Sequence, residues 1–345
     1  MPGPERSVLH VLPHPGGGGE TYVDLLSAMP GYRFERACLA PSPTPSPSDL
    51  GRGVVEIMRR ARRHQLIHVH GEVASGLCLP LLRTRPSVVT FHGLNLVRRA
   101  TGARRLAAAL NLRAVVRAAN RTICVSESEH DQLVRAIGSG AARRAVVIRN
   151  GVRSPAHNGE TERAGARGIL GIGESEVAGI WVGSLEAHKD PLTAVQAAQR
   201  AAITLLVVGG GSLRPQVERA ANKHIRLLGQ RSDIPRLLAA ADLYVLTSRR
   251  EGLSLSLLEA MAHGLAPIVT DLPENLEAIG DAGICVRPDA DSVAAAMRRL
   301  AEDADERDDL GARASQRVSR LFDAEAMAWR TRALYDDVLT SGRAS

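Results

Sequence analysis

Short apolar runs alternate along the chain with longer stretches that have the composition of helices, such as residues 51–64 and 103–119. In the first half the apolar runs cover residues 7–12, 33–40, 66–70, 87–92, 121–126 and 145–150. In the second half they cover residues 177–183, 203–209, 225–229, 242–247, 266–270 and 283–286. Strands that alternate with helices form parallel sheets with helices on both faces. The pattern predicts an α/β fold with doubly wound parallel sheets.

The length and the loop composition predict two domains. A chain of 345 residues exceeds one ordinary core and fits two domains of about 150 residues each. The segment 153–168 is polar, glycine-rich and weakly periodic, as linkers are. We place an N-terminal domain at 1–152, a linker region at 153–175, a C-terminal domain at 176–323, and a helix at 324–345 that crosses back to the N-terminal domain. Ligands of such sheets bind outside the carboxyl ends of the strands, so we expect a crevice between the domains.

Charge is spread unevenly over the chain. Residues 1–155 hold 22 basic and 10 acidic residues, which gives +12; the remainder holds 22 basic and 27 acidic, which gives −5 and a total of +7. The basic half is expected to meet an anionic surface or substrate. Within it, the arginine-rich helix at 103–119 has two interpretations: a core-facing helix with a solvated arginine face, or a docking surface for anionic lipid.

Cysteine usage and the N-terminus predict a cytoplasmic protein. The four cysteines form no CxxC pair, which is typical of free thiols in a reducing compartment. The apolar run before Pro13 is too short for a signal peptide, and no apolar span of ~20 residues occurs. We expect a cytoplasmic location, with peripheral contact at the inner face of the membrane as an open alternative.

The stretch EGLSLSLLEAMAHG, residues 251–264, holds two glutamates eight positions apart. Its second half is rich in helix formers and ends in Gly264, so a helix is predicted from about Ser254, with Glu251 in the loop before it. Backbone N–H groups and the helix dipole favour a phosphate at such a start. Glu251, before the helix, can accept hydrogen bonds from hydroxyls on one side of such a phosphate. Glu259, two turns into the helix, can accept them from hydroxyls on the other side. Alternatively, Glu251 caps the helix and Glu259 is merely exposed.

This stretch and its neighbours resemble the donor-binding half of retaining glycosyltransferases of family 4. The resemblance extends over PHPGGGGE (13–20), IHVHG (67–71), VVTFHG (88–93), VIRNGV (147–152), WVGSLEAHKDP (181–191) and VVGGGSLRPQVE (207–218). It implies the GT-B fold, with two Rossmann-like domains facing a central crevice, and it equates the family's E-x7-E signature with Glu251 and Glu259.

The resemblance implies a hexosyltransferase that moves a sugar from a nucleoside-diphosphate sugar to an acceptor with retention. It assigns catalysis to His92, Lys189 and Glu251. It assigns donor binding to Gly17, Gly18, Gly183, Ser184, Gly210, Arg231, Gly252, Leu253, Ser254 and Glu259. It also implies that the site needs no metal and no cofactor besides the donor substrate, and that nucleic acid is not a partner.

One position departs from the family pattern. The pattern is G-R-x4-K, and the chain keeps Gly183 and Lys189 but has Ser184 at the arginine position. Because arginine is used almost everywhere else, a lysine at 189 points to a need for a compact ammonium. We hypothesise that Arg249, Arg250 or Arg231 supplies the second positive charge.

Two other sequence patterns bear on ligand binding. His68 and His70 are interpreted as structural or crevice-rim residues, because the H-x-H pair has no third metal ligand at a suitable spacing. The Gly209–Gly211 run lacks the continuation of a dinucleotide fingerprint. A sugar-nucleotide epimerase, or a catalytically impaired nucleotide-sugar-binding protein with Ser184, remains an alternative function. The donor base, the sugar and the acceptor stay open.

Overall fold

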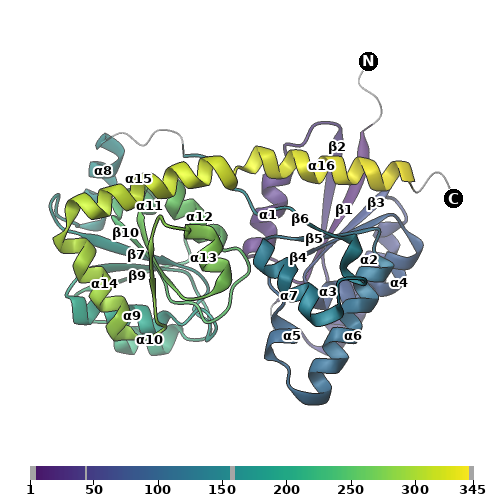
Figure 1. The fold of residues 1–345 in the computed structure, drawn as a ribbon, viewed down its shortest axis with the longest axis horizontal. Coiled ribbons are helices and arrows are strands. Elements are labelled where there is room, and N and C mark those ends of the chain that lie inside the picture. The colour runs from purple at the N-terminus through teal and green to yellow at the C-terminus, as the bar shows by residue number, and fades with distance from the viewer. Residues whose placement is uncertain (1–4, 43–44, 156–159, 342–345) are drawn as a thin grey trace. The chain divides into compact units, whose positions relative to one another are not determined.

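The computed structural model describes residues 5–42, 45–155 and 160–341 (Figure 1). The chain divides into two compact units. Unit 1 comprises Met1–Asn150 and Ala324–Ser345, and unit 2 comprises Gly151–Asp323. Each unit has its own parallel sheet with helices on both faces, as the apolar pattern predicts. No helix within the described ranges has the length and apolar character needed to cross a bilayer.

The sheet of unit 1 has six parallel strands in the order β2-β1-β3-β4-β5-β6. These are β1 (Arg6–Leu12), β2 (Tyr32–Cys38), β3 (Leu66–His70), β4 (Ser87–Phe91), β5 (Arg121–Cys124) and β6 (Ala145–Val147). All six lie within or overlap the predicted runs. The order reverses between β1 and β3, which is where ligands of open α/β sheets bind.

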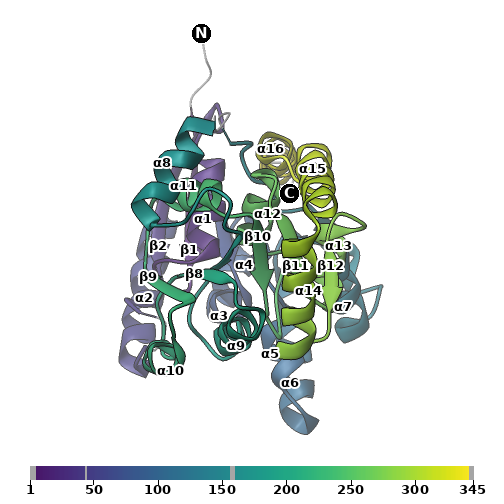
Figure 2. The same cartoon turned by 90° about the vertical axis from the view of Figure 1, so that its left-hand side faces the viewer.

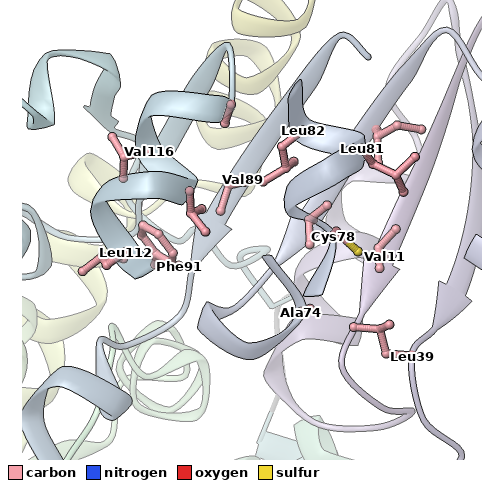
Figure 3. Close-up of a cluster of buried hydrophobic side chains, with 14 of the residues drawn as sticks. Val11, Leu39, Ala74, Cys78, Leu81, Leu82, Val89, Phe91, Leu112 and Val116 are labelled. Carbon is pink, nitrogen blue, oxygen red and sulfur yellow. The ribbon is translucent and has the colours of Figure 1, made fainter. Parts of the chain in front are cut away.

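The helices of unit 1 cover both faces of this sheet. They are α1 (Gly18–Leu26), α2 (Pro47–Ala61), α3 (Glu72–Leu77), α4 (Leu79–Thr84), α5 (Asn95–Arg99), α6 (Gly102–Ala118), α7 (Glu127–Ile137), the 3-10 turn η1 (Ala142–Arg144) and α16 (Ala324–Ser341). One face packs against α2 to α7, with Val89, Phe91 and Leu112 in its core (Figure 3). The opposite face packs against α1 and α16 through Tyr22 and Tyr335.

The sheet of unit 2 also has six parallel strands, in the order β12-β11-β10-β7-β8-β9. These are β7 (Ala178–Val182), β8 (Thr204–Val208), β9 (Ile225–Gly229), β10 (Leu243–Leu246), β11 (Ala266–Thr270) and β12 (Ile284–Val286). This is the strand order of dinucleotide-binding Rossmann domains, and the direction of winding reverses between β7 and β10.

Helices α9 and α14 cover one face of this sheet, and α11 and α12 cover the other (Figure 2). The helices of unit 2 are α8 (Glu160–Leu170), α9 (Pro191–Ala201), α10 (Arg214–Ala220), α11 (Ile234–Ala240), α12 (Leu255–Ala262), α13 (Pro273–Ile279), α14 (Ala290–Glu302) and α15 (Ala304–Leu321). The core on the α9 and α14 side is built from Val195, Met297 and their aliphatic neighbours.

Helix α8 lies within the segment that the sequence predicts as linker. Its Arg167 is 3% exposed and donates to the Ala240 carbonyl at 2.9 Å and to the Asp242 carboxylate at 3.3 Å. These bonds tie the helix to the strand that begins at Leu243. A polar, glycine-containing sequence therefore forms a packed helix here, because its arginine satisfies carbonyls at the end of α11, a contact that local composition does not reveal.

Gly311 allows α15 to approach the turn after α12. A Cβ at Gly311 would lie 2.1 Å from the Gly264 carbonyl oxygen, whereas a Cβ at Gly165 in α8 would meet nothing within 4 Å. We expect Gly311→Ala to lower the free energy of unfolding by about 1–3 kcal/mol through overpacking. Gly165→Ala should instead stabilise by roughly 0.5–1 kcal/mol through helix propensity. Denaturant unfolding of both variants measures the difference; equal effects would contradict the close packing.

Candidate functional site

Two loops meet at the carboxyl ends of β7 and β10 in unit 2. Residues 183–190 follow β7, and residues 247–254 follow β10. The Thr247 hydroxyl donates to the Asp190 carbonyl at 2.8 Å, and the backbone N–H of Arg249 donates to the His188 carbonyl at 2.8 Å. The two loops are thus joined at the point where the sheet reverses its winding, where α/β sheets bind ligands.

Lys189 and Glu251 form an ion pair across these loops. The Lys189 ammonium lies 2.7 Å from each carboxylate oxygen of Glu251, and Ser248 Oγ donates to one of them at 2.6 Å. Glu251 is 6% exposed, and the Lys189 side chain is 21% exposed. A buried carboxylate stays charged only when it is paired and hydrogen-bonded in this way. These bonds fix the Glu251 carboxylate, while the Lys189 ammonium stays partly accessible.

Helix α12 begins as the sequence predicts, with Ser254 as its N-cap. Ser254 Oγ accepts the Leu257 N–H at 3.4 Å, so the interpretation of Glu251 as the cap is wrong. Tyr244 Oη donates to Ser256 Oγ at 2.8 Å, which anchors the first turn to β10. The turn 252–254 between Glu251 and the helix is buried, and the first-turn N–H groups remain suited to an anion.

Glu259 lies at the start of the second turn of α12 and is half-buried rather than exposed. Burial raises the pKa of its carboxyl to about 7. No hydrogen-bond partner of this carboxyl occurs among the described residues, and the nearby His263 bonds to the Glu259 backbone carbonyl instead. A carboxylate that is withdrawn from water and uncommitted is suited to accept hydrogen bonds from ligand hydroxyls.

The arginines considered for the missing charge have different surroundings. Arg249 pairs with Asp190, with Nε 2.8 Å from Oδ2, while its own side chain is 61% exposed. Arg231 pairs with Asp233 through two bonds of 2.8 and 2.7 Å. Arg250 follows Arg249 in the same loop and is half-buried. Ser184 itself is exposed at the end of β7.

The glycine run after β8 has a packing reason. A Cβ at Gly209 would lie 1.8 Å from the Gly183 carbonyl oxygen, and one at Gly211 would lie 2.6 Å from the Leu185 carbonyl oxygen. Leu185 N–H also donates to the Gly210 carbonyl at 2.9 Å. The glycines therefore let two site loops pass backbone to backbone, a requirement that the sequence pattern alone does not identify.

In unit 1 the loop after β1 turns sharply into α1. Gly16 and Gly17 have φ of 83° and 80°, which other residues rarely adopt, and Gly17 is the N-cap of α1. Gly18 is the first helical residue. The Gly16 N–H donates to Glu20 Oε2 at 2.7 Å. Gly16 and Gly17 are therefore required by the conformation of this turn, and the donor-binding role of Gly17 and Gly18 stays a prediction.

A row of histidines lies on one face of the central strands of unit 1. His10 on β1 pairs in register with His68 on β3, and His70 pairs with Thr90 on β4. Because side chains alternate along a strand, His92, two residues beyond Thr90, follows on the same face. His10 is the third histidine that the H-x-H pattern lacks in the sequence, and strand register rather than sequence spacing brings it to the pair.

The histidine cluster is hydrogen-bonded in a way that does not suit a metal ion. One ligand atom from each of His10, His68 and His70 lies within 4.8 Å of the others. Both nitrogens of His68 are engaged, however, with Tyr335 Oη at 2.5 Å and Thr90 Oγ1 at 2.6 Å. The rings of His68 and His70 are stacked at 4.2 Å rather than turned toward a common point.

Two buried carboxylates, neither of them predicted from the sequence, support the neighbouring loops. Glu129 accepts the N–H of Gly93, directly after His92, and the N–H of Val125 at 2.8 Å. Glu72 accepts the Leu96 N–H at 2.7 Å. Each is an acidic residue in the first turn of a helix that follows a strand, which is the signal that could have identified them.

Two family models match the chain, one for each half. The model described as "Glycosyltransferase Family 4" matches residues 10–154, and the model described as "Glycosyl transferases group 1" matches residues 177–303. Together they cover most of the chain and include every candidate residue described above for the strand-end loops and α12.

Similar proteins include enzymes named for sugar transfer. The N-acetyl-α-D-glucosaminyl L-malate synthase of Bacillus anthracis is 32% identical over 182 residues, 49% of this chain and 48% of that protein, so the chain spans about half its length. Sucrose-phosphate synthase from Thermosynechococcus elongatus is similar with a TM-score of 0.82 at 21% identity, over 98% of this chain and 100% of that one. Anabaena HepE in complex with UDP-glucose has a TM-score of 0.79 at 20% identity, over 97% and 99%. These likenesses show a shared fold.

The raised pKa of Glu259 predicts a pH-dependent cost in stability. Because the folded-state pKa, about 7, exceeds the ordinary value of 4.5, the carboxyl is protonated in both states below pH 4.5 and carries no cost there, and stability falls as pH rises from 4.5 through 7. We expect Glu259→Gln to raise the free energy of unfolding by about 1–3 kcal/mol at pH 8 and by much less at pH 5. Urea unfolding at both pH values checks this. A matched Glu302→Gln change, at an exposed position, should show no such dependence.

Proposed function

The chain belongs to glycosyltransferase family 4, and from that membership we propose that it transfers a sugar from a nucleoside-diphosphate sugar to an acceptor with retention at the anomeric carbon. The observation that carries the proposal is the Lys189–Glu251 pair at the start of α12. It combines a fixed carboxylate, one compact cation and a helix N-terminus within one strand-end site. The UDP-glucose bound to HepE supports a donor of this class.

Each group in unit 2 then has a chemical role. The N–H groups around 252–254 and the Lys189 ammonium hold the diphosphate and stabilise its charge as the bond to the sugar breaks. Glu251 accepts hydrogen bonds from the sugar hydroxyls, and Glu259 accepts them from the ribose. Stabilisation of an oxocarbenium-like state and of the leaving diphosphate drives the reaction, and we propose that no metal is required.

Glu251 is held ready for this role before the donor arrives. Its two oxygens already receive bonds from Lys189 and Ser248, so little reorganisation is needed when hydroxyl groups join them. The Lys189 ammonium has three N–H donors, so it can bond to a phosphate and to Glu251 at the same time. The same cation therefore orients the carboxylate and neutralises the leaving group.

The serine at 184 leaves one arginine of the family pattern unfilled. We keep Arg249, Arg250 and Arg231 as the candidates for the second positive charge, and His92 as the unit 1 residue that contacts the sugar. Arg249 is linked to the site through its partner Asp190, which directly follows Lys189. The alternative, a protein that binds donors without turning them over, is separated by the assay below.

The two lysines of the chain provide a matched test of donor binding. We expect the melting temperature to rise with one class among UDP-, GDP-, ADP- and TDP-sugars, since saturation at ~100 times Kd adds about 2.7 kcal/mol of stability. Lys189→Ala should abolish this rise and reduce donor hydrolysis at least tenfold, whereas Lys223→Ala, at an exposed position, should change neither.

The same samples, assayed with EDTA and without acceptor, distinguish the readings of the site. Slow release of free sugar indicates a competent transferase. Binding without turnover indicates the impaired alternative, and loss of release with EDTA contradicts the metal-free proposal. Absence of any donor-dependent shift contradicts the proposed function.

We also propose that the first turns of α6 contact anionic lipid. Only the later part of α6 is buried in the core, through Leu112, Val115 and Val116. Leu106 is 63% exposed and Leu110 57% exposed, and Arg104 and Arg105 beside them are exposed as well. Exposed leucines flanked by arginines provide the two contributions that interfacial binding needs, apolar insertion and attraction to negative headgroups.

Vesicle co-sedimentation tests this surface. We expect binding to vesicles that contain phosphatidylglycerol and little binding to pure phosphatidylcholine. The double change Leu106→Ser and Leu110→Ser should reduce the bound fraction several-fold. Val55→Ser with Met58→Ser, which alters another exposed apolar pair in an arginine-rich helix, is the control. Equal loss in both variants, or no binding to either lipid, supports the interpretation of α6 as a solvated core helix.

A further inference from the structure

A row of three histidines connects the buried centre of unit 1 to the carboxyl end of its sheet. His10 Nδ1 lies 2.9 Å from His70 Nε2, and His70 Nδ1 lies 3.1 Å from His92 Nε2. The row begins at His10 Nε2, which is buried and has no hydrogen-bond partner. It ends at His92, which is half-buried.

We propose that His10 and His70 position His92 by fixing its tautomer, so that His92 carries its proton on Nδ1 and presents an N–H donor. Only the identity of the ligand that accepts the His92 hydrogen bond rests on the proposed function. The tautomer itself is a property of unit 1 alone.

The charge state of the three rings limits their hydrogen-bond pattern. Burial lowers the pKa of His10 to about 3 and of His92 to about 4, and it lowers the pKa of His70 well below its usual range. All three rings are therefore neutral near pH 7. A neutral imidazole has one N–H donor and one acceptor nitrogen. Each bond in the row then fixes the next ring, and the row has only two directions.

The orphaned nitrogen of His10 selects the direction. If the protons pointed inward, His10 Nε2 would be a buried N–H without an acceptor. If they point outward, it is a lone pair without a donor. Orphaned buried N–H groups are the rarer of the two in folded proteins. In the outward direction His10 Nδ1–H donates to His70, His70 Nδ1–H donates to His92 Nε2, and the proton of His92 must lie on Nδ1.

The second hydrogen-bonded chain in the cluster does not compete with this row. His68 uses both nitrogens, one with Tyr335 from α16 and the other with Thr90. Its ring stacks on His70 at 4.2 Å, and Tyr22 contacts His92 edge-on at 5.2 Å. These neighbours hold the rings in place without adding a donor or acceptor to the row.

The outward tautomer determines what His92 can bind. Among the described residues, Nδ1 of His92 has no partner, and it is not one of the buried unsatisfied atoms. An N–H at this position donates to an oxygen acceptor, such as a sugar hydroxyl or a phosphate oxygen. A lone pair there would repel a phosphate oxygen. His10 and His70 thus adapt His92 to an oxygen-rich ligand without contacting that ligand.

Nitrogen-15 NMR of the full chain, labelled at histidine, tests the tautomer directly and without any ligand. Long-range proton–nitrogen correlations distinguish protonated from unprotonated ring nitrogens, and single substitutions at positions 10, 70 and 92 assign the signals. We expect His92 with a protonated Nδ1 and an unprotonated Nε2. A protonated Nε2 on His92 in the unmodified protein overturns the proposal, whatever the variants do.

Two variants at position 70 separate positioning from simple packing. His70→Phe removes the N–H that bonds to His92, so we expect His92 to shift toward the Nε2-protonated form. The Kd for the nucleotide-sugar should rise about tenfold. His70→Gln keeps an amide donor and should retain the Nδ1-protonated form and most of the affinity. If both variants retain the Nδ1 proton, the row does not set the tautomer and the proposal fails. Because the spectra are recorded without donor, failure of the transferase proposal leaves this result unaffected.

Discussion

Parallel strand pairing is the constraint on which the rest of this structure depends. Every strand pair in both sheets is parallel, so the carboxyl ends of neighbouring strands lie along the same edge. Both faces of each sheet are covered by helices and must be apolar for most of their length. Polar side chains therefore collect mainly where the strands end, as the Lys189–Glu251 pair does. The histidine row extends from His10, inside β1, to His92 just beyond the end of β4, and its rings are hydrogen-bonded to one another.

At both edges the polar groups satisfy one another before any ligand is present. Glu251 has Lys189 and Ser248, and Glu129 has the N–H groups of Gly93 and Val125. Such pairing is required because an unpaired buried charge costs several kcal/mol. Glu259 differs, since its carboxyl has no partner among the described residues and its pKa is raised to about 7. The Glu251 carboxylate is therefore held by its partners, whereas the buried Glu259 carboxyl lacks them. Hydrogen bonds from a ligand would stabilise Glu259 more than Glu251.

The sequence predicts the twelve strands, the start of α12 at Ser254 and its end near Gly264, because these depend on local periodicity and capping. It does not predict α8, whose stability comes from Arg167 bonding to distant carbonyls. It also does not predict the place of His10, because strand register between β1 and β3 pairs it with His68, 58 positions away. The residues of E-x7-E are recognisable from sequence, whereas the bonding that prepares Glu251 depends on a contact between two loops 62 residues apart.

The helix α16 has a consequence for how the chain is made. Met327, Tyr335 and Val338 of α16 fill the core of unit 1, and Tyr335 completes the hydrogen bonds of His68. These residues follow the whole of unit 2 in the chain. During synthesis from the N-terminus, unit 2 has all its strands before unit 1 has its last helix. Unit 1 is synthesised first but completes its core last. A nascent chain therefore exposes the α16-binding face of unit 1 until residue 338 has left the ribosome.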